Sequence, residues 1–396
     1  MRIAFIFTHF LPNIGGTEIS MYYYARELVK KGHKVIVITT NAIGYRPVKL
    51  PPTEVMDGIE VRRLRYWPIP FYKQFMLAPL LPKILLSINI DAAIIFSLLP
   101  SFFIIASYLM LRMRNIPIIA HPQAHPYRSK YKGTFIALLD RIFIKTIGAL
   151  LLKKADWVIA LSQEERDFYL NECGVRRVTI LYEGVNHLPN DVTENDIQVF
   201  MRKYNLMPGN YIVVVGRIEE RKGLDVLIRA IAGVVKEVPD ARLLIIGADP
   251  ERLWPMYRRL CKVLGCDKHV YYLGRVPDRE LVCVYKLAKI VAIPSHFEAY
   301  SRVAFEALYY GKPVVATRGI ATHDIIKSYG IVTLTNNHVE LAKALIKLLK
   351  DRDFRETLSK RARAFAEGLT WCSRARSLES VLLRIVNNRK RLRLCE

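Results

Sequence analysis

The chain has 396 residues, of which 52% are apolar and 24% are charged. This length suits two domains of roughly 190 residues each, and the apolar share excludes wholesale disorder. Lys and Arg number 60 against 36 Asp and Glu, which gives a net charge of +24. We therefore expect an anionic partner, which could be a nucleic acid, an acidic lipid or a phosphorylated substrate.

The six cysteines form no C-x-x-C pair, which excludes a zinc ribbon and a thioredoxin-type motif. Thiols scattered through a chain of this size are typical of a reducing cytoplasm. The apolar run at residues 3–7 has only five residues and is soon followed by Pro12 and two glycines. This pattern indicates a strand and not a signal peptide.

The first half of the chain alternates short apolar runs with amphipathic stretches. A strand is expected at 3–7, a helix at 17–31 that ends before Gly32, and a strand at 34–40. Further strands are expected at 92–96, 116–120, 157–161 and 178–181. Strands that alternate with helices of ten or more residues predict a parallel α/β sheet.

Residues 92–111 carry no charge and are long enough to cross a membrane. Against a membrane span, three serines and one proline interrupt the run. A buried strand at 92–96, a helix at 101–114 and a strand at 116–120 would form a βαβ unit, whose strands are apolar throughout. We favour the βαβ interpretation.

The segment 128–154 is apolar but strongly basic. It contains one acidic residue, Asp140, and seven basic ones, namely Arg128, Lys130, Lys132, Arg141, Lys145, Lys153 and Lys154. Such a helix can lie on an anionic membrane surface, or it can be an ordinary packed helix with a solvated basic edge. Both interpretations stay open.

The strand and helix pattern restarts after the polar stretch 188–208, which we interpret as a linker. Strands are expected at 211–215, 242–246, 270–273, 290–293 and 314–316, and helices at 223–237 and 254–264. We therefore predict one domain at 1–187 and a second at 209–370. A final helix at 371–396, with a basic tail, is expected to pack back on the first domain.

Two pairs of residues are placed to bind phosphate. Gly15 and Gly16 stand between the first strand and its helix, where backbone N–H groups can face an anion, although an ordinary tight turn is the commoner explanation of such a pair. Arg217 and Lys222 follow the first strand of the second half, and two cations beside a helix start suit a diphosphate. Neither first strand is followed by G-x-G-x-x-G or by a G-x-x-x-x-G-K-[ST] loop, which argues against a dehydrogenase and a P-loop ATPase.

Glu298 and Glu306 are two carboxylates eight residues apart, just after the predicted strand at 290–293. A carboxylate accepts several hydrogen bonds, so the pair suits the hydroxyl groups of a sugar. Glu306 lies in an apolar helix, which disfavours a solvated role. The N–H groups of the loop between them, at Tyr300, Ser301 and Arg302, would face phosphate oxygens.

Together these motifs resemble the retaining glycosyltransferases of family 4 (GT4). The family's GT-B fold is α/β, with two doubly wound Rossmann-like domains and a cleft between them. The resemblance covers nearly the whole chain. It rests on the opening Gly15-Gly16-Thr17-Glu18, the segment 155–162, Glu183-Gly184-Val185-Asn186 in place of Asn-Gly-Val-Asp, Gly216-Arg217, Lys222-Gly223, and the E-x7-E of Glu298 and Glu306.

The resemblance implies transfer of a hexose from a UDP- or GDP-sugar. It assigns catalysis to His121, Arg217, Lys222 and Glu298, and donor binding to Gly15, Gly16, Arg217, Lys222, Glu298, Tyr300, Ser301, Arg302 and Glu306. The two cations would hold the diphosphate and stabilise its leaving charge, Glu298 would contact the sugar and Glu306 the ribose. Because these cations could replace a divalent metal, no metal or other cofactor is expected. The Asp351-Arg352-Asp353 triplet is interpreted as solvated or as a helix cap.

The sequence departs from the family pattern in two loops. Ala299-Tyr300-Ser301 replaces the usual Gly-Phe-Gly, and Gly319-Ile320-Ala321-Thr322-His323-Asp324 replaces Gly-Gly-x-x-Glu. The loss of both glycines narrows the backbone freedom near the donor. These changes affect the expected identity of the donor sugar more than the expected class of reaction.

The basic and apolar first domain, including Arg62, Arg63, Arg65 and residues 71–86, suits a lipid or lipid-linked glycan as acceptor. A cytoplasmic enzyme at the inner face of the membrane is the expected form. A soluble sugar or polysaccharide acceptor and a GT-B sugar-nucleotide epimerase are the alternatives within the fold. A nucleic-acid-binding protein would also explain the charge, but no RRM, KH or zinc-finger signature supports it.

Overall fold

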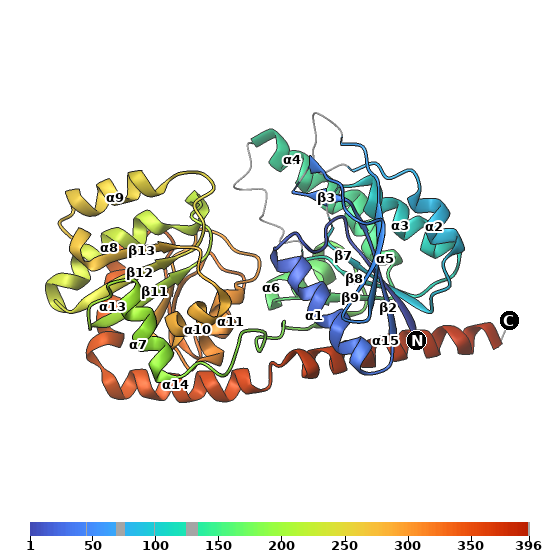
Figure 1. Cartoon of the computed structure of the whole chain (residues 1–396). Coiled ribbons are helices and arrows are strands. Elements are labelled where there is room, and N and C mark those ends of the chain that lie inside the picture. Colours follow the sequence, from blue (N-terminus) through green and yellow to red (C-terminus); the bar gives the residue numbers. More distant parts are fainter. Residues whose placement is uncertain (45, 69–75, 99, 124–133, 395–396) are drawn as a thin grey trace. The chain divides into compact units, whose positions relative to one another are not determined.

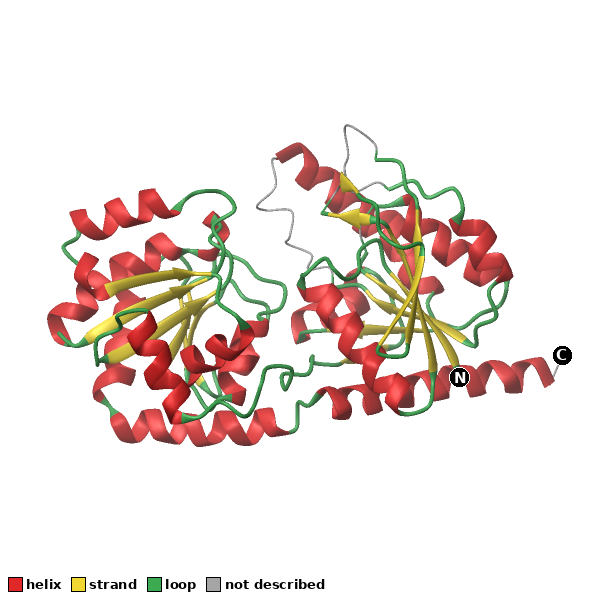
Figure 2. Ribbon diagram, in the orientation of Figure 1, coloured by secondary structure: helices red, strands yellow, loops and turns green. Residues whose placement is uncertain are grey.

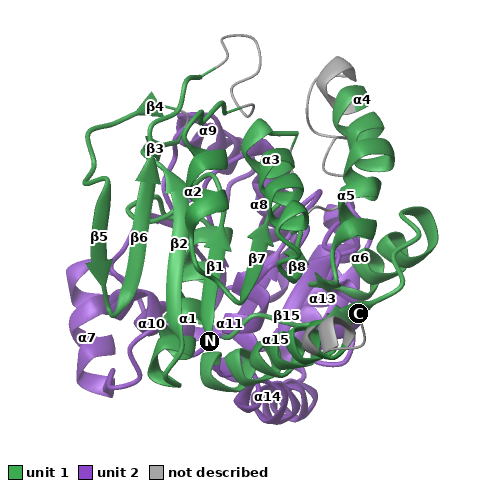
Figure 3. Ribbon diagram, turned by 90° about the vertical axis from the view of Figure 1, so that its right-hand side faces the viewer, with its two compact units in different colours: residues 1–184, 371–396 green, residues 185–370 purple. Residues whose placement is uncertain are grey.

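The structure is a computed structural model that describes all residues except 45, 69–75, 99, 124–133 and 395–396. The chain forms two compact units, residues 1–184 with 371–396 and residues 185–370 (Figure 3). Each unit is a largely parallel sheet with helices packed on it (Figure 2). The predicted α/β fold class is confirmed.

The first unit begins with β1 (Arg2–Ile6), α1 (Gly16–Lys30) and β2 (Lys34–Thr40), close to the predicted bounds. Its sheet has the order β10-β9-β8-β7-β1-β2-β6-β5, in which β5 alone runs antiparallel. The remaining elements of its main sheet and the helices between them are β5 (Thr53–Met56), β6 (Ile59–Leu64), α2 (Leu81–Ser87), β7 (Ala92–Phe96), α3 (Phe102–Met113), β8 (Ile118–His121), α4 (Thr134–Phe143), α5 (Ala149–Lys154), β9 (Trp157–Ala160), α6 (Gln163–Asp167) and β10 (Val178–Ile180).

The hairpin of β5 and β6 was not predicted, because charged residues break the apolar pattern of the edge strand β5 and of its neighbour β6. Arg63 of β6 is buried and pairs with Glu54 of β5 at 2.5 Å, and it also donates to the Leu11 carbonyl. A buried guanidinium is tolerated only with such partners. Arg63 is therefore neutralised inside the fold and adds no exposed positive charge to the basic first domain. Of the stretch 71–86, which was also expected to suit a lipid acceptor, residues 71–75 lie outside the described residues.

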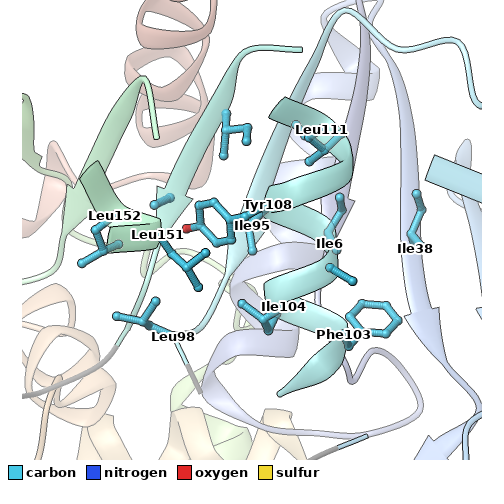
Figure 4. Close-up of a cluster of buried hydrophobic side chains, with 14 of the residues drawn as sticks. Ile6, Ile38, Ile95, Leu98, Phe103, Ile104, Tyr108, Leu111, Leu151 and Leu152 are labelled. Atoms are coloured by element: carbon cyan, nitrogen blue, oxygen red, sulfur yellow. The ribbon is translucent and has the colours of Figure 1, made fainter. Parts of the chain in front are cut away.

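Alternate residues of β1 point to opposite faces of its sheet. Ile3 and Phe5 belong to a cluster with α1 and with α15 (Trp371–Leu394), whereas Ala4 and Ile6 belong to a cluster with α2, α3 and α5. Figure 4 shows part of the second cluster, where side chains of α3 face the strands. Because both faces are covered, the central strands are apolar throughout.

The uncharged stretch 92–111 forms β7 and the first part of α3, and β8 follows. The βαβ interpretation is therefore confirmed. In the part of the chain that the structure describes, no helix combines the length and the apolar character that a membrane crossing requires.

The second unit has six parallel strands in the order β13-β12-β11-β14-β15-β16. This order, with its first strand in the middle, is that of a dinucleotide-binding sheet. The strands are β11 (Asn210–Val215), β12 (Ala241–Ile246), β13 (Val270–Gly274), β14 (Ala288–Ile293), β15 (Val314–Thr317) and β16 (Gly330–Thr333). The principal helices are α7 (Glu194–Lys203), α8 (Leu224–Glu237), α9 (Trp254–Val263), α10 (Asp278–Leu287), α11 (Arg302–Tyr309), α13 (His338–Lys350) and α14 (Arg352–Glu367) (Figure 1).

The stretch 188–208, expected to be a linker, contains α7 and belongs to the second unit. Thr193 caps α7 in a capping box with Asp196, which explains why a polar and acidic stretch forms a helix. Arg279 of α10 pairs with Asp191 at 2.9 Å and with Asp196 at 3.2 Å. The acidic residues that suggested a linker therefore cap and attach a helix.

The last helix, α15, belongs to the first unit. Its buried residues recur every three or four positions, which places them on one face: Trp371, Ala375, Leu378, Leu382 and Ile385. The Trp371 ring packs against Tyr23 and Tyr24 of α1, with ring centroids 5.2 and 5.1 Å apart.

Candidate functional site

The loops after β11 and β14 meet at the carboxyl edge of the second sheet. The chain reverses its direction of travel across the sheet between these two strands, and in such sheets ligands bind at this point. Arg217 and Lys222 lie in the loop after β11, whereas Glu298 and Ser301 lie in the loop after β14. All four line one small cavity of about 20 Å³, enough for a water molecule.

A glycine brings the two loops together. Gly223 has φ +64°, and a side-chain carbon on it would collide with the Pro294 carbonyl oxygen. The close backbone approach places Lys222 Nζ 2.5 Å from Glu298 Oε1, an oxygen that also accepts from Ser295 Oγ at 2.6 Å. Backbone bonds to Gly319 and Ala321 hold Glu298 from the other side.

Glu298 is buried but charged. Burial opposes its ionisation, yet the charge of Lys222 and the hydrogen bonds from Lys222 and Ser295 hold the pKa of the carboxyl below its usual value. The structure therefore joins two predicted site residues, Lys222 and Glu298, in one ion pair. Ser295 was not predicted, and its serine type alone carries no signal for this contact.

Arg217 reaches the same cavity but has an acidic partner. Its guanidinium lies 2.9 Å from Glu219 Oε1, and Arg221 lies 2.7 Å from Glu219 Oε2. The Arg217 side chain is 66% exposed. Exposed ion pairs of this kind are weak, so Arg217 can exchange Glu219 for a stronger anion.

Tyr300 and Ser301 directly precede α11, and Arg302 is its first residue. Ser301 occupies the N-cap position, and its buried hydroxyl has no hydrogen-bond partner among the described residues. Tyr300 stacks on Phe305 with ring centroids 4.8 Å apart. The free N–H groups of a helix N-terminus, with an unused hydroxyl beside them, suit an anion.

Glu306 lies on α11 and is 4% exposed. Its Oε2 accepts a hydrogen bond of 2.5 Å from the Tyr285 hydroxyl, and its Oε1 lies 3.3 Å from His187 Nε2. Burial opposes ionisation, but the contacts with His187 and Tyr285 keep the pKa of Glu306 below its usual value. Sequence reasoning missed both partners, because they are 21 and 119 positions away.

The first unit holds the other predicted residues, and it is described by itself. Gly15 is the N-cap of α1 and Gly16 its first residue. A side-chain carbon on Gly15 would collide with the Glu18 carboxylate, which folds back toward the helix start. The end of the Glu18 side chain can move aside and Gly15 has an extended backbone with φ −142°, so neither space nor conformation requires glycine at this position.

His121 ends β8 and is fully buried between aromatic rings, with Phe96 stacked at 5.1 Å. Neither ring nitrogen has a hydrogen-bond partner among the described residues. Burial lowers the pKa of His121 to about 4, although the charge of Glu183 opposes this shift. His121 is therefore neutral near pH 7.

A hydrogen-bond network that the sequence did not predict joins α1 to the loops after β8 and β10. Thr17 donates to Gln123 Oε1, Gln123 Nε2 lies 3.4 Å from Glu183 Oε1, and Ser20 donates to the same Glu183 oxygen. Gln123 has φ +47°, an uncommon conformation for a residue with a side chain. The network fixes the start of α1 beside His121. In the sequence, Glu183 stands out only as a departure from the family motif.

Two further acidic positions have other roles. Asp351 caps α14 by accepting from the Phe354 backbone N–H at 2.9 Å, which agrees with the interpretation of the Asp351-Arg352-Asp353 triplet as a helix cap. Asp324 is exposed and pairs with Lys327 at 3.4 Å. Within the described residues, no three His, Cys, Asp or Glu side chains lie together as a metal site.

Two family models cover most of the chain. The model described as Glycosyltransferase Family 4 matches residues 14–187, and that described as Glycosyl transferases group 1 matches residues 196–365. The D-inositol 3-phosphate glycosyltransferase of Corynebacterium diphtheriae is 27% identical over 96% of this chain and 94% of that protein.

Solved structures share the fold. The sucrose-phosphate synthase of Thermosynechococcus elongatus matches with a TM-score of 0.74 and 20% identity, over 98% of this chain and 99% of that one. Anabaena HepE in complex with UDP-glucose matches with a TM-score of 0.74 and 20% identity, over 97% of this chain and 100% of that one. Both similarities extend over the two units, so the fold is GT-B. The chain is thus a glycosyltransferase that uses a nucleotide sugar, and it belongs to family 4.

Proposed function

We propose that this glycosyltransferase moves a hexose from a UDP- or GDP-sugar to a lipid or lipid-linked glycan, with retained anomeric configuration. The observation that carries the donor part is the cluster at the carboxyl ends of β11 and β14. It combines the cation of Lys222, the unused Ser301 hydroxyl and the start of α11 with the carboxylates of Glu298 and Glu306. Cations and N–H groups suit a diphosphate, and carboxylates suit sugar hydroxyls.

In the proposed reaction, the bond between the anomeric carbon and the donor phosphate oxygen breaks, and a bond to the acceptor hydroxyl oxygen forms. The nucleoside diphosphate leaves with the electron pair, and the acceptor proton passes to it or to water. Lys222, Arg217 and the N–H groups of α11 would stabilise the negative charge of the leaving group. The contact of His121 with the donor sugar stays a prediction from the family resemblance, because His121 is fully buried in the first unit.

UDP-glucose is the first donor to test, because HepE was solved with it. Isothermal titration would compare UDP- and GDP-sugars, in EDTA and in magnesium, on wild type, Glu306→Ala and the control Glu237→Ala, which changes an exposed carboxylate. We expect a Kd of about micromolar order in EDTA, lost in Glu306→Ala and kept in Glu237→Ala. Binding only in magnesium would contradict metal-independent binding. No binding of any donor would contradict the donor proposal.

The stereochemistry can be read from the product. Proton NMR of the freshly formed glycoside should show the anomeric configuration of the donor, and the inverted anomer would contradict retention. An epimerase would release an altered sugar without any acceptor, so a reaction run without acceptor separates that alternative.

The acceptor proposal rests on a long helix at the side of the first unit. α4, a π-helical turn (Ile144–Gly148) and α5 follow one another without a break. Five large apolar side chains on this helix are 42–55% exposed: Leu138, Leu139, Ile142, Ile147 and Leu150. Arg141, Lys145, Lys153 and Lys154 are exposed beside them. An apolar face with basic flanks suits an anionic membrane surface. Arg128, Lys130 and Lys132 of the expected basic segment lie outside the described residues.

Vesicle sedimentation tests this surface. We expect wild type to bind vesicles that contain anionic phosphatidylglycerol and to bind pure phosphatidylcholine weakly. The double variant Ile142→Ser, Leu150→Ser should lose about tenfold in vesicle affinity, because two apolar anchors are removed. The control Val199→Ser, Val263→Ser changes two exposed apolar residues on α7 and α9 of the second unit. Equal binding by both double variants would contradict the membrane surface.

A soluble phosphorylated acceptor is the second candidate. It is favoured by the names of two relatives, a D-inositol 3-phosphate glycosyltransferase and a sucrose-phosphate synthase. Turnover with inositol phosphates or hexose phosphates, at equal rates with and without vesicles, would favour it over a lipid acceptor.

A further inference from the structure

The carboxylate of Glu306 is held on both oxygens within the second unit. The Tyr285 hydroxyl donates to Oε2 at 2.5 Å, and His187 Nε2 lies 3.3 Å from Oε1. The Glu306 side chain is 6% exposed and that of His187 10% exposed. A carboxylate has about four lone-pair positions, so two partners leave about two positions for further donors.

Tyr285 is a rigid partner. It lies on α10, is fully buried, and stacks on Tyr310 with ring centroids 5.3 Å apart and an interplanar angle of 10°. The phenol therefore has little freedom to turn away from Glu306. Burial also favours its protonated form, so the hydroxyl acts as a donor to the carboxylate.

His187 comes from a different part of the chain. It lies in the segment that opens the second unit at Val185, more than a hundred residues before Glu306. Its Nε2 approaches the oxygen that Tyr285 leaves unused. The two partners together fix both the position and the plane of the carboxylate, which one hydrogen bond alone would leave free to rotate.

We propose that Tyr285 and His187 are positioning residues that present Glu306 to the two neighbouring hydroxyls of the donor ribose. This inference rests on the proposed function, in which the carboxylates of Glu298 and Glu306 bind hydroxyl groups of the donor. Its consequence is nucleotide selectivity: a carboxylate fixed to accept from both hydroxyls rejects a 2′-deoxynucleotide, because one buried lone pair then has no donor.

The test measures the Kd of UDP and of 2′-deoxy-UDP by isothermal titration on the full chain, with the GDP pair in parallel. The variants are Tyr285→Phe, His187→Ala and His187→Gln, whose amide N–H can replace Nε2–H. The matched control is Tyr310→Phe. It removes a hydroxyl from the same aromatic stack, and that buried hydroxyl has no hydrogen-bond partner among the described residues.

We expect wild type to prefer UDP to 2′-deoxy-UDP by at least about tenfold. Tyr285→Phe and His187→Ala should each weaken UDP binding by about tenfold and reduce this preference to about threefold. His187→Gln and Tyr310→Phe should keep it. Once an acceptor is known, the same two variants should raise the donor KM and leave kcat within about threefold, because the ribose lies away from the reacting bond.

Three outcomes separate the proposals. Wild type that binds neither UDP nor GDP overturns the proposed function and this inference together. The inference alone is overturned if wild type binds UDP and Glu306→Ala does not, while Tyr285→Phe and His187→Ala keep the same preference for UDP as the control Tyr310→Phe. If circular dichroism shows that Tyr285→Phe does not fold, His187→Ala and His187→Gln decide. An equal preference for UDP over 2′-deoxy-UDP in these two variants overturns the inference.

Discussion

Removal of the Lys222 ammonium would leave the Glu298 carboxylate buried without its cation. The two side chains are 20% and 8% exposed and are 2.5 Å apart. Breaking a buried ion pair by removing one partner costs about 3–5 kcal/mol of folding free energy. Because Lys222 keeps some solvent contact and Ser295 still donates to Glu298, we expect Lys222→Met to cost about 3 kcal/mol, at the lower end of this range.

In a Glu298→Gln background the same lysine change leaves no unpaired carboxylate, so it should cost only about 1 kcal/mol. The double-mutant cycle should therefore give a coupling free energy of about 2 kcal/mol. Fluorine NMR of 5-fluorotryptophan-labelled protein in a urea series can isolate the second unit. Of the four tryptophans, Trp254 is the one in that unit.

A coupling below about 0.5 kcal/mol would refute the reasoning, since such a value is typical of a solvated surface pair. It would mean that the ion pair of Lys222 and Glu298 is solvated and not buried as described. A large coupling free energy together with unchanged donor binding in Lys222→Met would support the ion pair but contradict the role of Lys222 in binding the diphosphate.

Three more predictions concern stability and titration. Burial, which outweighs a hydrogen bond from the Leu161 N–H, raises the pKa of Glu165 from 4.5 to about 7. Between pH 4.5 and 7 the folded state therefore holds a proton on Glu165 that the unfolded state has lost, and wild type should lose about 3 kcal/mol of folding stability across this range in urea unfolding. Glu165→Gln should not show this loss. If the stability of both proteins changed with pH in the same way, the raised pKa would be contradicted. NMR titration of His121 should show a midpoint near pH 4, and a midpoint near 6.5 would place the ring in solvent. Trp371→Ala should cost about 3–5 kcal/mol, whereas the exposed Trp67→Ala should cost below about 1 kcal/mol; equal effects would mean that α15 does not pack on the first unit.

Several site residues could be located from the sequence because their signals are local. Arg217 and Lys222 follow an apolar strand and precede a helix, and Glu306 sits in an apolar helix just after another strand. In a parallel sheet the carboxyl ends of strands share one edge, so residues after different strands can be expected to meet there. The pairing of Lys222 with Glu298 follows this logic.

Other features could not be predicted, because they depend on which distant side chain fills a given space. Acidic residues at 191–196 suggested a linker, but Arg279 and a capping box attach them as α7. Arginine is usually found at the surface, yet Glu54 and a backbone carbonyl allow Arg63 to be buried. In each case a charge looks solvated in the sequence until its partner is known.

The sequence by itself determined the order and type of most strands and helices, and it placed the candidate phosphate- and sugar-binding residues along them. It did so because hydrophobic periodicity, glycine turns and helix starts are properties of neighbouring residues. Only the tertiary structure decided that Tyr285 and His187 hold Glu306, and that Gln123 and Glu183 fix the start of α1. Such contacts join residues that are distant in the chain. They form because a buried polar group without a partner costs free energy, and the pattern of neighbouring residues does not indicate which distant residue will be the partner.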